Sequence, residues 1–389
     1  MSWLDEQLQA DLNRREADDL RRRLRFIPPA TVDLASNDYL GLARHPEVIA
    51  AACAATEAYG AGARASRLVS GHTALHERLE TELATFKGCE AALVFPSGYQ
   101  TNIAVLTALA RSGDTILCDK RNHASLIDAC WLAQARSTVV RYYHSSERLE
   151  ALLSKLSASS GRLLIVTDAV FSMDGDLADL PRLIELAQSF QAVLILDDAH
   201  GTGTLGQQGH GTIEHFGLPI QNSAIIHIGT LSKALGSQGG FVAGSRVLID
   251  FLVNQARPFI YTTGLAPAAC GAALKAVEII RREPQRRARL REVTQRLAQR
   301  LCALGFDARQ QPSPIIPVIV GAAARAVALS EALLTRGVWC PAIRPPTVPA
   351  GTSRLRVTAS AALTDQDIER ALAAFAEAVD IVTPAPGKD

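Results

Sequence analysis

At 389 residues the chain has room for two or three domains, its hydrophobic fraction of 48% is typical of a globular protein, and its formal net charge is only +1. A charge this close to zero argues against bulk binding to nucleic acid, and the sequence shows neither a membrane-spanning apolar run nor a signal-peptide pattern. Seven cysteines without CxxC spacing predict reduced thiols, no metal site and a cytoplasmic location.

The N-terminal segment predicts an amphipathic helix at residues 3–25. Pro28-Pro29 ends this helical pattern. We expect residues 1–45 to form an N-terminal arm whose helix packs on the body of the protein. Four leucines carry the helical spacing: Leu4, Leu8, Leu12 and Leu20.

Residues 46–260 alternate helical patterns with short apolar runs. This alternation predicts βαβ units and therefore an α/β fold with a mainly parallel, seven-stranded sheet in one large domain. The runs expected to form strands are Ala91–Phe95, Thr115–Cys118, Thr138–Tyr142, Leu163–Thr167, Val193–Leu196, Ala224–Ile228 and Gly240–Ala243.

Residues 261–389 predict a small α+β domain. The pattern is helical from about Ala266 to Ala303 and again from Thr364. Between these helices lie three apolar runs expected to form strands: Ile315–Val320, Val338–Ile343 and Leu355–Thr358.

Two segments of the large domain carry most of the chemistry. Asp197-Asp198-Ala199-His200 follows the apolar run that ends at Leu196, and Lys233 follows the next run. Buried parallel strands present such residues at the carboxyl edge of a sheet, where open α/β proteins bind ligands. Such a lysine can form a Schiff base with an aldehyde, and a strand-end carboxylate can hold a protonated pyridine nitrogen. Together they predict a site for pyridoxal 5'-phosphate (PLP).

A phosphate group needs backbone N–H groups and hydroxyls around it. Ser97-Gly98-Tyr99 precedes a helix that begins near Gln100, and a helix N-terminus offers free N–H donors to an anion. Gly98 allows the backbone to approach closely, and Thr230 adds a hydroxyl. Gly60–Ala65 fits a GxGxxA dinucleotide pattern, but it follows a helical pattern rather than a strand, so we reject that interpretation.

With these motifs the chain resembles the α-oxoamine synthases, PLP-dependent enzymes of fold type I, the aspartate aminotransferase fold. The resemblance runs over nearly the whole length. Besides the segments named above, its motifs are Ser36–Leu42, Ser66–Gly71, Pro96–Tyr99, Asn122–Ser125, Phe171–Asp176, Tyr261–Thr263 and Ile343–Thr352.

The resemblance implies how the cofactor ring is held. Asp197 would pair with the pyridine nitrogen, and the family pattern favours it over Asp198. His200 would contact the phenolic oxygen of the ring, and Ser172 would lie near that oxygen. His123 would stack on the ring face.

The resemblance also implies a catalytic lysine and a partner subunit. Lys233 would hold PLP and then, once freed, act as the general base. Tyr99 and Thr230 would contribute to cofactor binding together with Gly98. Thr262-Thr263 matches a pair that family members donate to the phosphate of the partner subunit, which predicts a homodimer with composite active sites.

Substrate-binding residues are implied at both ends of the chain. Arg356 matches the arginine that holds the amino acid's carboxylate, with Arg354 as its competitor. Arg21 and Thr347 match residues on the acyl side. Asn37 of the first motif, together with His123, is expected beside the substrates.

The Ile343–Thr352 segment is most similar to family members that condense L-alanine with a pimeloyl thioester and release carbon dioxide and a thiol. Other members remain alternatives: 2-amino-3-ketobutyrate CoA ligase, 5-aminolevulinate synthase and serine palmitoyltransferase-like enzymes. An aminotransferase or a non-enzymatic PLP-binding regulator is a further alternative. The thiol carrier, coenzyme A or acyl carrier protein, is left open.

Two local features complete the sequence-based expectations. Arg64 and Ala65 stand where the family often has glycine, which puts the flexibility of that loop in doubt. Eight arginines lie between Arg281 and Arg300, against only Glu283 and Glu292. This helix is either a solvated face or a docking surface for an acidic acyl carrier protein.

Overall fold

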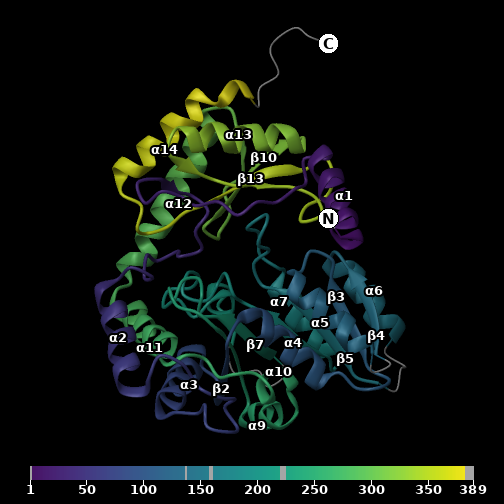
Figure 1. Cartoon of the computed structure of the whole chain (residues 1–389). Helices are drawn as coiled ribbons and strands as arrows, with labels where there is room; N and C mark the ends of the chain where they lie inside the picture. The colour runs from purple at the N-terminus through teal and green to yellow at the C-terminus, as the bar shows by residue number, and fades with distance from the viewer. Residues whose placement is uncertain (1, 136–137, 157–160, 220–224, 382–389) are drawn as a thin grey trace. The chain divides into compact units, whose positions relative to one another are not determined.

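The computed structural model describes residues 2–135, 138–156, 161–219 and 225–381 (Figure 1). Within these ranges the chain forms two compact units. The sheet unit comprises residues 37–172 and 176–289, and the terminal unit comprises residues 1–36, 173–175 and 290–389. The sequence-based division at residues 45 and 260 stays a prediction. In the described part of the chain, no helix combines the length and the apolar character needed to cross a membrane.

A seven-stranded sheet organises the sheet unit, in the order β2-β8-β7-β6-β5-β3-β4. Strand β8 is antiparallel to both neighbours, and the other pairings are parallel. The predicted α/β fold with a mainly parallel sheet is therefore confirmed. The strands are β2 (Ala91–Phe95), β3 (Thr115–Asp119), β4 (Val139–Tyr143), β5 (Leu163–Asp168), β6 (Val193–Asp197), β7 (Ile225–Thr230) and β8 (Gly240–Gly244).

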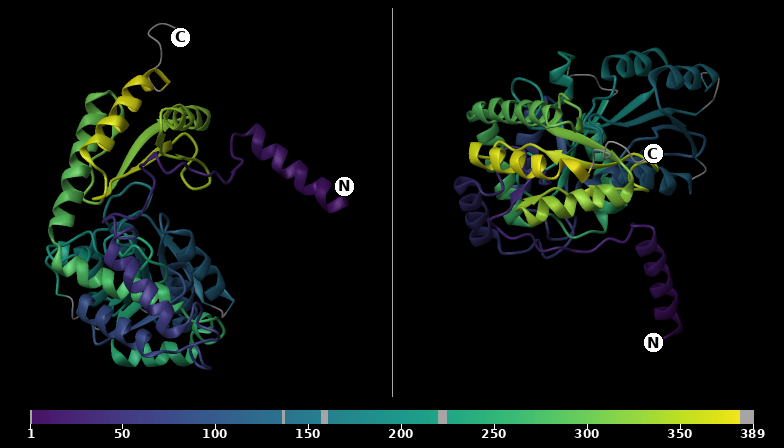
Figure 2. Two further views of the ribbon diagram at one scale, coloured as in Figure 1. Left: turned by 60° about the vertical axis from the view of Figure 1, so that its left-hand side comes forward. Right: turned by 90° about the horizontal axis from the view of Figure 1, so that it is seen from above.

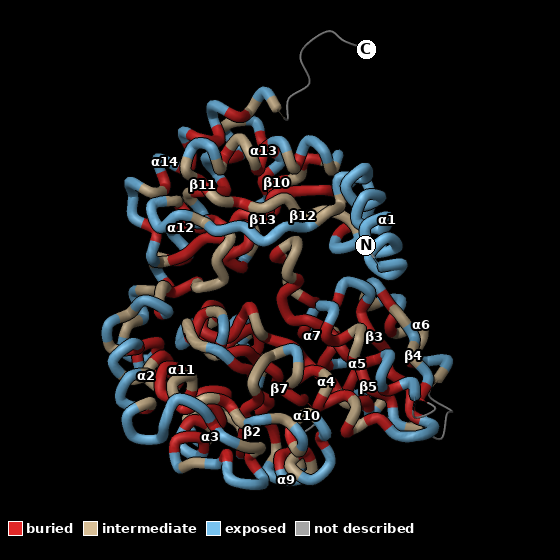
Figure 3. The backbone as a smooth tube through the Cα atoms, in the orientation of Figure 1, coloured by how far each residue is buried: buried red, intermediate tan, exposed pale blue. Residues whose placement is uncertain are grey.

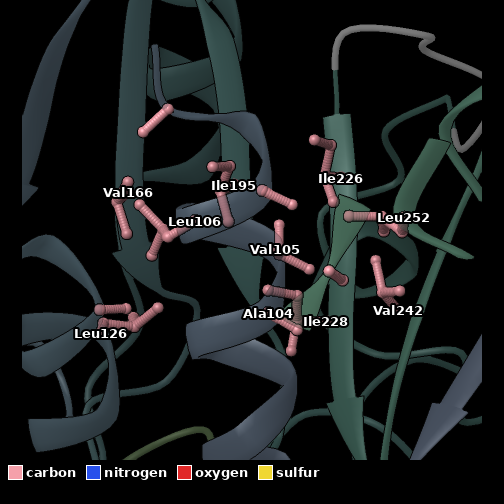
Figure 4. Close-up of a cluster of buried hydrophobic side chains, with 14 of the residues drawn as sticks. Ala104, Val105, Leu106, Leu126, Val166, Ile195, Ile226, Ile228, Val242 and Leu252 are labelled. Carbon is pink, nitrogen blue, oxygen red and sulfur yellow. The ribbon is translucent and has the colours of Figure 1, made fainter. Parts of the chain in front are cut away.

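Helices cover both faces of this sheet, which explains why its inner strands are continuous apolar runs. All six residues of β5 are buried, whereas Val139 and Arg141 of the edge strand β4 are exposed (Figure 3). Successive side chains of β5 enter opposite cores: Leu164 packs with helices α4, α5 and α9, and Ile165 packs with α6 and α7. Figure 4 shows the first of these cores, built around α4.

The helices of the sheet unit agree with the predicted alternation. They are α2 (Pro46–Tyr59), α3 (Ala74–Lys87), α4 (Gly98–Leu109), α5 (Ala124–Gln134), α6 (Ser146–Leu156), α7 (Leu180–Ser189), α8 (Thr212–His215), α9 (Arg246–Gln255), α10 (Arg257–Ile260) and α11 (Pro267–Arg282).

The terminal unit contains a four-stranded antiparallel sheet, β12-β13-β10-β9, and a parallel strand pair, β1-β11. Its strands are β1 (Val32–Asp33), β9 (Asp307–Ala308), β10 (Ile315–Gly321), β11 (Val338–Trp339), β12 (Ala342–Ile343) and β13 (Ser353–Thr358). Its helical segments are α1 (Trp3–Ala17), α13 (Ala323–Thr335), α14 (Asp365–Glu377) and η1 (Val379–Ile381), and α12 (Gln285–Ala303) belongs to it from Leu290 onward.

Two predicted elements of the C-terminal part are interrupted. The single strand expected at 338–343 is two short strands that join different sheets, with Pro341 between them. The continuous helix expected from Ala266 to Ala303 breaks after Arg282, because Pro284 restricts the backbone of the residue before it.

The N-terminal helix is shorter and more exposed than predicted. Helix α1 begins with a capping box between Ser2 and Asp5 and ends at Ala17; Asp19 beyond it has a left-handed φ of 55°. None of its residues is buried, so the expected packing on the body is absent in the single chain. Figure 2 shows α1 projecting away from the sheet of its own unit.

Candidate active site

The candidate site lies at the carboxyl ends of three adjacent parallel strands. Asp168 ends β5, Asp197 ends β6 and Thr230 ends β7. Asp168 and Asp197 are register partners, so their side chains leave neighbouring strands at the same level. This is the edge at which the sequence predicted a ligand.

The two consecutive aspartates have different surroundings. Asp198 is 1% exposed and accepts hydrogen bonds from Lys87 Nζ at 3.0 Å and Thr212 Oγ1 at 3.0 Å. Asp197 accepts from the Ala199 N–H at 3.0 Å and from Asn102 Nδ2 at 2.7 Å, and forms no ion pair with the described residues. The structure therefore leaves Asp197, rather than Asp198, without a neutralising cation.

Lys233 approaches His200, which contacts a buried tyrosine on its other side. Lys233 Nζ lies 2.9 Å from Nε2 of His200, and His200 Nδ1 lies 2.6 Å from the hydroxyl of Tyr39. That hydroxyl also donates to Asn37 Oδ1 at 3.1 Å. One ring thus joins the predicted lysine to the Ser36–Leu42 motif, and both ring nitrogens are engaged.

His123 caps the N-terminus of α5 and keeps an exposed surface. Its ring nitrogen Nδ1 accepts a hydrogen bond from the backbone N–H of Ser125. The backbone N–H of His123 donates to Asp168 Oδ2 at 2.6 Å. Burial of the other side of the ring lowers the pKa of the imidazole, which favours a neutral ring. Burial, and then the charge of Asp197, raise the pKa of Asp168 well above its usual range.

The N-terminus of α4 forms the candidate phosphate cradle. Ser97 caps this helix through the N–H of Gln100, and Gly98 follows it directly. A Cβ added at Gly240 of β8 would lie 2.5 Å from the Gly98 Cα, so glycine is required there for the helix end to approach the sheet. Thr230 Oγ1, beside Gly98, lies 2.8 Å from the Ser232 hydroxyl.

These groups fit PLP in their chemistry. The helix end and the hydroxyls suit a phosphate, the carboxylate of Asp197 lacks a cation, and Lys233 stands at the same strand edge. Four further residues were predicted to contact the cofactor. The Tyr99 hydroxyl donates to Asp128. Ser172 and Thr262 are half-buried, and Thr263 is exposed.

The predicted substrate residues Arg356, Arg21 and Thr347 belong to the terminal unit. Arg354 pairs with Asp174, and Arg356, which is 8% exposed, donates to the hydroxyl of Thr358 at 3.3 Å. On the acyl side, the sequence predicted Arg21 and Thr347. The structure places Nη2 of Arg22, the neighbour of Arg21, 3.5 Å from the Thr347 hydroxyl.

Arg21 itself lies 3.5 Å from Glu16 and is partly exposed. It stands beyond the end of α1, so the helix predicted at residues 3–25 does not reach Arg21–Arg25. In the glycine-rich loop, Arg64 has a left-handed φ of 67°, a conformation that favours glycine. The loop therefore keeps a glycine-like backbone despite the substitution.

Sequence reasoning missed four residues of the site: Tyr39, Asn102, Ser125 and Asp168. Tyr39 and Ser125 were inside recognised motifs but received no role. Asp168 follows an apolar run in the same way as Asp197, and that signal could have identified it. Asn102 lies one helical turn after Gly98, a spacing that places both on one face of α4.

Comparisons with known proteins agree with this geometry. Residues 29–375 match the family model described as aminotransferase class I and II. The 8-amino-7-oxononanoate synthase of Stutzerimonas stutzeri (strain A1501) is 48% identical over 381 residues, which cover 95% of this chain and 96% of that protein. A protein of the same name from Pseudomonas putida (strain F1) is 47% identical with the same coverage.

Solved structures give the same fold. A serine palmitoyltransferase from Sphingomonas wittichii is 31% identical, with a TM-score of 0.88 over 97% of this chain and 98% of that chain. The 8-amino-7-oxononanoate synthase from Francisella tularensis is 28% identical, with a TM-score of 0.75 over 90% and 98% of the two chains. A serine palmitoyltransferase from S. paucimobilis with bound PLP–myriocin is 29% identical, with a TM-score of 0.89 over 98% and 99%.

Three observations identify the family: the lysine and aspartate at the strand edge, the candidate phosphate cradle at α4, and these matches over nearly the whole chain. The chain belongs to the class I and II aminotransferase family of PLP-dependent enzymes and, within it, to the group of the 8-amino-7-oxononanoate synthases.

Proposed function

We propose that the chain condenses L-alanine with a pimeloyl thioester and gives 8-amino-7-oxononanoate, carbon dioxide and a free thiol, as a step of biotin biosynthesis. The names of its 47–48% identical relatives support this product. The Ile343–Thr352 segment supports the same choice among the α-oxoamine synthases. We place the reaction in the cytoplasm, in keeping with the seven free cysteines.

The observation that carries the proposal is the approach of Lys233 to His200 at the strand edge beside Asp197. A lysine whose Nζ is 2.9 Å from an imidazole has a partner that orients it and exchanges protons with it. Bound PLP supplies an aldehyde and an electron-accepting ring, which make the α-carbon of an amino acid acidic. Lys233 then removes the α-proton of alanine and returns a proton after carbon dioxide has left.

Asp197 and His123 set the electrostatics around the ring. The carboxylate of Asp197 would hold the pyridine nitrogen in its protonated form, and no cation of the described residues competes for this carboxylate. Burial lowers the pKa of His123, and because the residue is still exposed, its ring would be accessible for stacking on the cofactor. His200 would contact the phenolic oxygen of the cofactor, and the Tyr39 hydroxyl orients the imidazole through Nδ1.

The phosphate is held by the N–H groups after Ser97 and by the hydroxyl of Thr230. We assign Gly98, Tyr99 and Ser172 to the same cofactor site. Thr262 and Thr263 of a second copy complete it, which makes the enzyme a homodimer with composite sites. Exposed apolar side chains support such an interface: Leu24, Phe26, Val69 and Tyr261 are each more than two-thirds exposed in the single chain.

We also assign residues to the two substrates. Arg356 binds the carboxylate of alanine, and its guanidinium suits a bidentate contact. Arg21 and Thr347 bind the acyl chain, with Arg22 as an addition from the structure. Asn37 and His123 lie on the substrate side of the cofactor.

A second candidate is favoured by the solved serine palmitoyltransferases, which superpose with TM-scores of 0.88 and 0.89. Such an enzyme would use serine and a long, uncharged acyl chain. The test is thiol release measured over a matrix of amino acids (alanine, glycine, serine) and acyl-CoA chains (pimeloyl, palmitoyl, succinyl, acetyl). Preference for alanine with pimeloyl supports the proposal, and preference for any other pair overturns it.

A further inference from the structure

Asn102 occupies a position between the two groups assigned to the cofactor ring. It lies on α4 and is 1% exposed. Its Nδ2 lies 2.7 Å from Oδ2 of Asp197 and 2.7 Å from Oγ of Ser125. Both N–H groups of one amide are therefore used, one toward the carboxylate and one toward a hydroxyl.

The orientation of this amide follows from the charge beside it. Rotating the amide by half a turn would direct Oδ1 at the carboxylate of Asp197, where two acceptors would repel each other. In the observed orientation Oδ1 is buried and has no hydrogen-bond partner among the described residues. An unpaired buried carbonyl is costly, so the amide is retained for what its N–H groups do.

The donor and acceptor roles in the hydrogen bonds from Asn102 through Ser125 to His123 can be assigned. The backbone N–H of Ser125 donates to Nδ1 of His123 at 3.2 Å, so this nitrogen must carry a lone pair. The Ser125 hydroxyl, 2.7 Å from the same nitrogen, therefore donates to it and accepts from Asn102. In the neutral ring the proton must then sit on Nε2.

The same amide acts on Asp197. The two oxygens of that carboxylate each accept one N–H, from Ala199 and from Asn102, and the two bonds together fix the rotation of the carboxylate. Its register partner on β5 is Asp168, whose own pKa is raised by burial and then by the charge of Asp197. Loss of the Asn102 donor would leave Oδ2 without the N–H that holds it, so the carboxylate would be free to rotate.

We propose that Asn102 is a positioning residue that orients the ring-nitrogen carboxylate and, through Ser125, holds His123 in the tautomer that presents Nε2–H. This inference rests on the roles proposed for Asp197 and His123. Its readouts need no acyl donor, so its failure is distinguishable from a wrong choice of substrates.

The test uses the full-length enzyme stripped of PLP and titrated with it. Asn102→Leu keeps the volume and removes both N–H groups. We expect PLP to bind about 10- to 100-fold more weakly, the cost of losing a hydrogen bond to a charged group. Nitrogen-15 NMR of labelled histidine, with the His123 signal assigned by His123→Asn, should show the Nε2–H tautomer mixed with or replaced by the other.

Two further variants separate the two arms. Ser125→Ala removes the hydroxyl donor to Nδ1 of His123 and leaves the backbone N–H, so the share of the Nε2–H tautomer should fall while PLP affinity stays within about twofold. Thr107→Val is the matched control on the same helix: the Thr107 hydroxyl donates to the Ile103 carbonyl at 2.6 Å, and neither readout should change on its loss. If Asn102→Leu does not fold, Asn102→Asp keeps the shape and sets a carboxylate against Asp197, so PLP affinity should fall as pH rises.

Wild-type PLP affinity together with an unchanged His123 tautomer in Asn102→Leu, or in Asn102→Asp if only that variant folds, would overturn the proposal. A lower melting temperature of the PLP-free enzyme with both readouts unchanged would also overturn it, because the role would then be structural only.

Discussion

The Nζ atom of Lys87 lies 3.0 Å from the carboxylate of Asp198, and both side chains are at most 3% exposed. This buried ion pair ties the end of α3 to the segment that follows β6. It leaves the preceding residue, Asp197, as the strand-end carboxylate that is not neutralised by a cation of the described residues. We therefore predict different effects for the two aspartates: substitution of Asp197 should lower turnover, and substitution of Asp198 should lower stability.

Asp197→Asn should fold normally, retain part of its PLP and lose roughly 100-fold or more in turnover, because an amide cannot hold the pyridinium proton by charge. Asp198→Asn should keep the PLP absorbance spectrum of the wild type but lose stability, by about 3–5 kcal/mol, because Lys87 is left buried and unpaired. Turnover and thermal unfolding measured on both variants check this. The reverse ranking would show that the wrong carboxylate was assigned.

Acid should destabilise the protein through a buried histidine. His76 is fully buried, and burial, followed by the charge of Arg67, lowers its pKa from 6.5 to about 4. Its contribution to stability is therefore complete above pH 6.5 and is lost as pH falls toward 4, because the unfolded chain then binds more protons. The expected slope is about 1.4 kcal/mol per pH unit.

Replacing this histidine should flatten that slope. Denaturant unfolding at pH 7.0, 6.0 and 5.0 would be compared for the wild type, His76→Gln and, as a control, the exposed His215→Gln. His76→Gln should show a smaller loss of stability on acidification than the other two proteins. Equal slopes in all three would contradict the assignment.

The partner-donated threonines can be tested by complementation. Lys233→Ala and the double variant Thr262→Ala/Thr263→Ala should each be nearly inactive as pure dimers. If the sites are composite, mixed dimers formed after subunit exchange contain one intact site and should recover up to about a quarter to a half of the wild-type activity per dimer. No recovery despite proven exchange, or a fully active monomer in sedimentation, would refute the composite site.

In the arginine-rich segment at residues 281–300, the structure leaves fewer arginines available for docking than the sequence suggested. Arg287 is 3% exposed and donates to two backbone carbonyls, and Arg286 pairs with Glu283, so neither belongs to a free surface. If an acyl carrier protein docks here, Arg291→Glu, which alters an exposed arginine, should raise the Michaelis constant for a carrier-protein thioester several-fold at low salt.

The coenzyme A thioester serves as the internal comparison, and its Michaelis constant should stay nearly unchanged in that variant. Equal effects on both donors, or none on either, would leave this helix as a solvated face.

The sequence predicted the sheet well because strands buried on both faces leave continuous apolar runs, and their polar ends mark Asp197 and Lys233. It failed at α1, where leucine spacing suggested burial that a single chain does not provide. It could not show that Lys87 neutralises Asp198, or that Asn102 reaches Asp197. Both contacts join residues about 100 positions apart and depend on the packing of α3 and α4.

The most direct test of the central claim follows the carboxyl carbon of alanine. With L-alanine labelled at that carbon and pimeloyl-CoA, the enzyme should release labelled carbon dioxide and free thiol in equal amounts and form 8-amino-7-oxononanoate. Lys233→Ala should release neither carbon dioxide nor thiol. The control Lys275→Ala, which removes a partly exposed ion pair with Glu278, should match the wild type. Keto acid formation from alanine without thiol release, or full activity in Lys233→Ala, would contradict the account.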